Sequence, residues 1–120
     1  MTAAARALEA VVDLLQAAGV NATRDAGSFQ PAPIGVLVGL PTLLRRTLSA
    51  ATFQIPVLAI SGDPLNELAN TDRLYAEADA IAFELGESSY TPTVWAGSGR
   101  VEPLPAVEIL ATVTVEQEEE

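Results

Sequence analysis

The sequence predicts an α+β fold, with a mostly antiparallel or mixed sheet and two helices packed on one face. Two segments repeat apolar residues at helical spacing, several others alternate with period two, and short connections join them. The 120 residues, 49% of them hydrophobic, suffice for one compact core but hardly for two domains. We therefore expect a single α+β domain over residues 1–115 and an acidic, disordered tail over residues 116–120.

The first element is expected to be an amphipathic helix over residues 2–18. Apolar side chains recur there at helical spacing, and Gly19 follows as a helix stop. The expected apolar face comprises Leu8, Val11, Val12, Leu15 and Ala18. Residues 20–33 are rich in turn formers and are interpreted as a loop or a short strand.

The next segment, "IGVLVGL" at residues 34–40, has three possible interpretations. A phosphate-binding loop would need a lysine, which the chain lacks, and a membrane anchor would be more than twice as long. Strand alternation instead predicts a buried strand with Ile34, Val36, Val38 and Leu40 on one face. Gly35 and Gly39 would allow close packing against a neighbour, such as a helix lying across the sheet.

Residues 43–60 are interpreted as two further strands or as one long bent strand. Pro56 lacks an N–H group, so it predicts a sheet edge or a bulge. Arg45 and Arg46 interrupt the apolar pattern and must face water or a partner. One face of the later strand is expected to carry Phe53, Ile55, Val57 and Ala59, and the other Gln54, Leu58 and Ile60.

A second helix is predicted to begin at Asp63 as N-cap, with Pro64 as first helical residue, and to end at Gly86. Two strands follow, "TVWAG" and "AVEILATVTV", the latter covering residues 106–115. The expected apolar side of the helix comprises Leu68, Leu74, Tyr75, Ala78, Ile81, Ala82 and Leu85, and that of the last strand Val107, Ile109, Ala111, Val113 and Val115.

The residue types leave little room for catalysis. The chain has no cysteine, histidine or lysine, which excludes thiolate nucleophiles, imidazole bases and Schiff-base chemistry. Ser88 and Ser89 have no candidate base, and the surroundings of Asp25 lack the ligand spacing of a calcium loop. Asp63 is explained by its capping role. We expect no enzyme, no catalytic residues, no metal and no cofactor.

The charge points away from nucleic acid and membrane as binding partners. Sixteen acidic and six basic residues give a net charge of −10, which repels DNA and anionic lipid. Glu9 and Asp13 interrupt the first apolar segment, so a signal peptide is not expected, and no run is long enough to span a bilayer. All six basic residues are arginines, a pattern typical of a GC-rich genome or of arginines placed in subunit contacts.

The sequence resembles the tail terminator, or tail-completion, proteins of long-tailed bacteriophages, especially those of actinobacteria. The resemblance spans nearly the whole chain and rests on overall pattern: the helix "ALEAVVDLLQAAGV", the Pro-bounded strand "APIGVLVGLP", "FQIPVLAISGDP" leading into "LYAEADAIAFEL", then "YTPTVWAG" and "PAVEILATVTV". It implies a structural virion protein that forms a hexameric ring. Such a ring caps the tail tube, ends its polymerisation and docks the tail to the head connector.

The resemblance further implies which partners the chain meets. These are further copies of itself, the major tail tube protein and the head–tail connector proteins, with DNA passing through the ring without specific binding. The location would be the head-proximal end of the tail in the virion, and the host cytoplasm during assembly. Arg45, Arg46 and Phe53 are predicted at the subunit interface. Another phage neck component, or a non-phage acidic protein-interaction module, remains the alternative.

Overall fold

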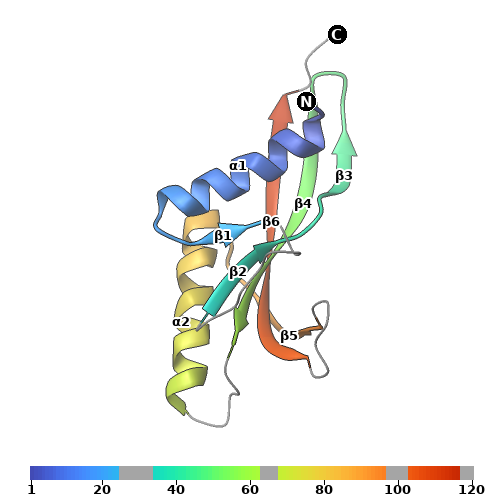
Figure 1. The fold of residues 1–120 in the computed structure, drawn as a ribbon. Helices are drawn as coiled ribbons and strands as arrows, with labels where there is room; N and C mark the ends of the chain where they lie inside the picture. The colour runs from blue at the N-terminus through green and yellow to red at the C-terminus, as the bar shows by residue number, and fades with distance from the viewer. Residues whose placement is uncertain (25–33, 63–67, 97–102, 117–120) are drawn as a thin grey trace.

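The computed structural model describes residues 1–24, 34–62, 68–96 and 103–116, and it has two helices and one six-stranded mixed sheet (Figure 1). The strand order is β1-β2-β4-β6-β5, and β3 pairs with β4 further along that strand. Among the paired strands of the described residues, β1 and β2 form the one parallel pair, and the other four pairs are antiparallel. The elements are α1 (Ala3–Ala17), β1 (Ala22–Thr23), β2 (Ile34–Val38), β3 (Thr42–Arg46), β4 (Ala50–Ser61), α2 (Leu68–Leu85), β5 (Thr91–Trp95) and β6 (Leu104–Glu116).

The two long strands β4 and β6 form the centre of the sheet. They pair antiparallel from Ala50 opposite Glu116 to Ile60 opposite Ala106. Both helices pack on the same face of this pair, as expected from the sequence, and their side chains join those of the strands in the main core. The buried residues of β4 and β6 on that face are Ala51, Phe53, Ile55, Val57, Ala59, Val107, Ile109 and Ala111. The predicted α+β fold and the alternation in both strands are therefore confirmed.

Local signals fix both ends of α1. The Thr2 hydroxyl accepts a hydrogen bond from the Ala5 amide at 3.1 Å, as an N-cap does. At the other end Gly19 has a φ of 86°, and the Val20 amide donates to the Leu15 carbonyl at 2.9 Å. This Schellman arrangement requires a left-handed residue, which glycine adopts without a Cβ penalty. The predicted stop at Gly19 is confirmed. Ala18, which was expected on the apolar face, is exposed, whereas Ala7 is buried.

Helix α2 ends as predicted, while its predicted start lies outside the described residues. Gly86 has a φ of 69°, and the Glu87 amide donates to the Ala82 carbonyl at 2.9 Å. Asp63 and Pro64, expected to cap the helix, are among residues 63–67, which are not described. Leu68 was expected on the apolar side but is 84% exposed, so that prediction is wrong. The buried residues of α2 are Leu74, Ala78, Ile81 and Ala82.

Residues 43–60 lie in two strands, and Pro56 sits in the more central one, β4. The Pro56 carbonyl accepts a hydrogen bond from the Gly39 amide at 2.8 Å, so its backbone faces β2 and β3 rather than β6. There the partner of β4 changes from β2, at Val57, to β3, at Gln54. The missing N–H therefore falls where no ladder bond is needed. Pro56 marks neither a sheet edge nor a bulge. A proline is tolerated within β4 here because the neighbouring strand changes from β2 to β3 at this position.

Gly39 is required at the same place for a different reason than expected. A Cβ on this residue would lie 2.7 Å from Cγ of Pro56, which is closer than van der Waals contact permits. The close neighbour is therefore the ring of an adjacent strand, not a helix crossing the sheet. Leu40 was expected on the buried face of the strand, but β2 ends at Val38 and Leu40 is 82% exposed.

The opposite face of the sheet divides into an apolar and a polar half. In the half around β2 and β5, four buried residues form a second cluster, with Leu58 and Trp95 packed against it: Leu37, Ile60, Leu104 and Ala106. In the other half, next to β3, the face carries polar residues, and the hydroxyls of Thr52 and Thr114 lie 2.9 Å apart. Strand β6 continues to Glu116, the first residue of the predicted tail, and residues 117–120 are not described.

Candidate subunit interface

The β3–β4 hairpin carries several of the exposed large apolar side chains of the described chain. In Figure 1 it projects at one end of the sheet, where α1 begins and β6 ends. All five residues of β3 are exposed. Thr47 closes the turn, with its amide donating to the Ala50 carbonyl at 2.8 Å and its hydroxyl accepting from the Ala50 amide at 3.1 Å. The exposed leucines of this hairpin and of the segment that enters it are Leu40, Leu43, Leu44 and Leu48.

A bulge in β3 determines where its arginines point. The pairing with β4 shifts between Leu43, opposite Phe53, and Arg45, opposite Thr52. In a regular strand Leu43 and Arg45 would share a face, but the extra residue sends them to opposite faces. Leu43 thus lies on the helix side of the sheet and Arg45 on the polar side. Both Arg45 and Arg46 are exposed, as predicted, and Arg46 pairs opposite Ala51.

Phe53 does not lie with the arginines on the surface. Its side chain is 4% exposed and belongs to the main core between the sheet and the helices. The strand alternation that placed Phe53 with Ile55 and Val57 already implied this burial, and it outweighs any surface role for an aromatic ring. Its burial therefore argues against Phe53 at an interface, while a contact at Arg45 and Arg46 stays a prediction.

A second exposed feature lies along β6, on the side of β4 opposite β3. Strand β5 pairs with β6 only as far as Glu108, so on the side away from β4 the described residues place no strand beside the stretch from Ile109 to Glu116. Side chains shield part of this edge instead. The Thr112 amide donates to Oε1 of Glu87 at 3.3 Å, and Nη2 of Arg6 donates to the Glu116 carbonyl at 2.6 Å. We call residues 109–116 the open edge of β6.

An apolar groove of about 150 Å³ borders the open edge of β6 on the helix side. It lies between α1, the end of α2 and the middle of the open edge. Leu14, which is 45% exposed, forms part of its wall. The lining residues are Ala10, Val11, Leu14, Leu85, Ala111, Thr112 and Val113.

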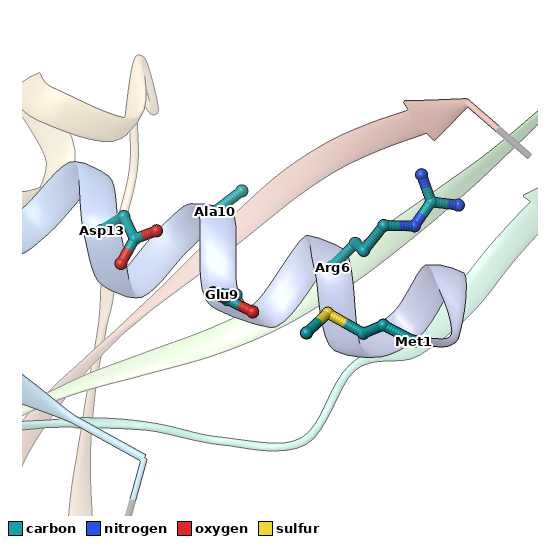
Figure 2. Close-up of a pocket in the computed structure, with 5 residues that line it drawn as sticks. All are labelled: Met1, Arg6, Glu9, Ala10 and Asp13. Atoms are coloured by element: carbon teal, nitrogen blue, oxygen red, sulfur yellow. The ribbon is translucent and has the colours of Figure 1, made fainter.

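A wider depression along α1 has both charged and apolar lining residues and is open to solvent. Met1, Arg6, Glu9, Ala10 and Asp13 line it. Figure 2 shows Arg6 extending toward the end of β6, while Glu9 and Asp13 lie further along the helix. Because the Arg6 guanidinium binds the Glu116 carbonyl, its evident role is to hold the start of α1 to the end of β6.

The described residues offer few groups for chemistry. No three carboxylate side chains gather among them in a way that could hold a metal ion. The Tyr90 hydroxyl donates to Oδ1 of Asp79 at 2.6 Å, and this hydrogen bond raises the pKa of Tyr90 above its ordinary value of 10. Tyr90 also lies against Tyr75, with ring centroids 5.8 Å apart, so it ties the segment before β5 to α2. Within the described ranges, neither helix is long and apolar enough to cross a bilayer.

No protein-family model matches this chain, and neither curated proteins nor solved structures give a significant match. The candidate interface consequently rests on the exposed hairpin and the open edge of β6. Sequence reasoning proposed the arginines because charge interrupts an apolar run. It missed the leucines beside them, because an apolar residue on a fully exposed strand has the same local signal as a buried one.

Proposed function

We propose that this chain is a structural virion protein, the tail terminator of a long-tailed bacteriophage. In this role a hexameric ring caps the tail tube, ends its polymerisation and docks the tail to the head connector. The order of elements along the chain resembles that of tail terminators, and this resemblance supports the proposed family. The observation that carries the assembly role is the pair of uncovered strands, β3 and the open edge of β6, in one small subunit.

The position of these two strands favours a ring over a simple pair. Strand β3 borders β4 on one side, and the open edge of β6 lies on the opposite side of β4. A contact that joins two different surfaces leaves one of each free after every addition, so copies add head to tail until the rotation closes. Closing the ring covers both strands, which would otherwise be sites of uncontrolled pairing.

The charge of the chain suits a channel that DNA traverses. Its net charge of −10 gives an electrostatic barrier to tight binding of the phosphate backbone. The sheet face next to β3 carries several threonines besides Arg45, with Thr52 and Thr114 hydrogen-bonded to each other. Neutral hydroxyl groups bind a passing duplex weakly compared with a field of arginines.

Electron microscopy of tail tubes tests this function directly. Tube protein from the genome that encodes the chain would be polymerised with and without the purified chain. We expect a ring at the head-proximal end of each tube, and tubes that stop growing when the chain is added. Tubes of unchanged length with bare ends, together with a stable monomer in solution, would instead favour an acidic protein-interaction module.

A further inference from the structure

Strand β3 and the open edge of β6 lie opposite the same stretch of β4, so they occupy the same level along the strand direction. This match defines a specific contact between copies. We infer that β3 of one copy lies beside the open edge of β6 in the next copy, so that the sheets join into one continuous belt. This contact deepens the proposed ring function and rests on it. The occupant of the open edge is thus a second copy of the chain, and three properties of the described residues support it.

The first property is the register that a closed ring imposes. Cyclic symmetry relates copies by rotation without translation along the axis. If the axis runs along the strands, a residue in the next copy keeps its height. Thr42, Gln54 and Thr112 occupy one row across β3, β4 and β6. The next copy's Thr42 would therefore lie beside Thr112. Strands β3 and β6 both run antiparallel to β4, so this intermolecular pairing is parallel.

The second property is the fit of Leu43 to the apolar groove. Leu43 pairs with Phe53, and Phe53 with Val113, so these three residues share a row and face the helices. Val113 lines the groove beside the open edge of β6. In the inferred register, the next copy's Leu43 reaches the open side of Val113, where the groove begins. Leu43, which is 44% exposed in the single chain, is then covered by Leu14 and its neighbours.

The third property is charge complementarity. Residues 26–62 contain two arginines and no acidic residue, while all sixteen acidic residues lie elsewhere. Arg45 shares a row with Thr52 and Thr114, one step along the same face from Glu116. The sequence after Glu116 adds three more glutamates. The basic strand of one copy would thus meet the acidic end of β6 in the next, as complementary interfaces do.

The remaining edges of the sheet are poor alternatives. Strand β1 has two residues, and β5 carries Pro92, which cannot donate a ladder bond. At the open edge of β6, strand addition would replace the side-chain contacts that Glu87 and Arg6 make with the backbone. The edge therefore has a cover in the single chain that a neighbouring strand can displace.

Engineered cysteines test the contact cleanly, because the natural chain has none. In Thr42→Cys/Thr112→Cys, two strand spacings of roughly 4.8 Å separate the positions within one copy, which is beyond disulfide reach. Both positions are exposed, so the fold should be retained, as circular dichroism would check. In the inferred contact the two positions are direct neighbours. Oxidation should give a ladder of linked chains that ends at the closed ring.

The matched control is Thr42→Cys/Thr93→Cys, which places the second cysteine on β5 and should give no ladder. A linked product that stops at two chains would contradict the inference, because it indicates a symmetric pair. The mass of the unmodified chain separates this inference from the proposed function. A ring that forms normally while Thr42→Cys/Thr112→Cys stays unlinked would overturn this contact alone, whereas a chain that stays monomeric would overturn both.

Discussion

The contact between Gly39 and Pro56 yields a quantitative prediction about the sheet. Replacing Gly39 by alanine would place a Cβ 2.7 Å from Cγ of Pro56 and 3.4 Å from its carbonyl oxygen. Overpacking of this kind costs about 1–3 kcal/mol. The φ of Gly39 is not positive, so alanine also gains about 0.4–1 kcal/mol by restricting the unfolded chain. The net loss in the free energy of unfolding should therefore lie between roughly 0 and 2.6 kcal/mol.

A second substitution identifies the cause of that loss. In Pro56→Ala the ring atoms Cγ and Cδ are absent, so in this background Gly39→Ala should keep only the gain of about 0.4–1 kcal/mol and be slightly stabilising. The coupling energy of the double-mutant cycle should then be about 1–3 kcal/mol. Denaturant unfolding followed by circular dichroism, at one fixed chain concentration, measures all four variants. Equal losses from Gly39→Ala in both backgrounds would refute the steric reasoning.

Three further predictions address the interface, the core and one titrating group. Arg45→Glu/Arg46→Glu should abolish oligomers, because both exposed charges on β3 reverse; an unchanged ring by light scattering would remove that role from them. Ile109→Ala should lower the free energy of unfolding by about 2–5 kcal/mol, because the side chain is fully buried at the centre of β6; a loss below about 1 kcal/mol in denaturant unfolding would contradict its place in the core. The folded pKa of Tyr90 exceeds the unfolded value, so its stabilising hydrogen bond is present below pH 10 and lost as pH rises through the folded pKa. An absorbance titration should show a lower tyrosine midpoint in Asp79→Asn, and an unshifted midpoint would argue against this bond.

Long periodic segments allowed most of the fold to be predicted from the sequence. The alternation in β4 and β6 set which face each residue occupies, and the glycines after the two helices marked their ends. These signals are local, so a single sequence contains them. The errors arose where a residue's environment depends on distant strands. Pro56 looked like an edge residue because its neighbours, β2 and β3, divide along β4 only in three dimensions.

The candidate interface could be proposed from the sequence only in part, for the same reason. Arg45 and Arg46 stood out because charge interrupts an apolar segment. Phe53 was assigned to the surface although its own alternation placed it in the core. The bulge that sends Leu43 and Arg45 to opposite faces has no local signature in this sequence, and neither has the open edge of β6. Both depend on how far the neighbouring strands extend.

The mass of the purified chain in solution tests the central claim most directly, because a shape-matched building block must assemble. Sedimentation across a range of concentrations would follow the 12.5 kDa chain. The proposed function predicts one closed species with six times the chain mass, and no larger polymers, since a completed ring leaves neither β3 nor the open edge of β6 uncovered. A chain that remains at its monomer mass at every concentration would contradict the claim that its exposed strands serve assembly.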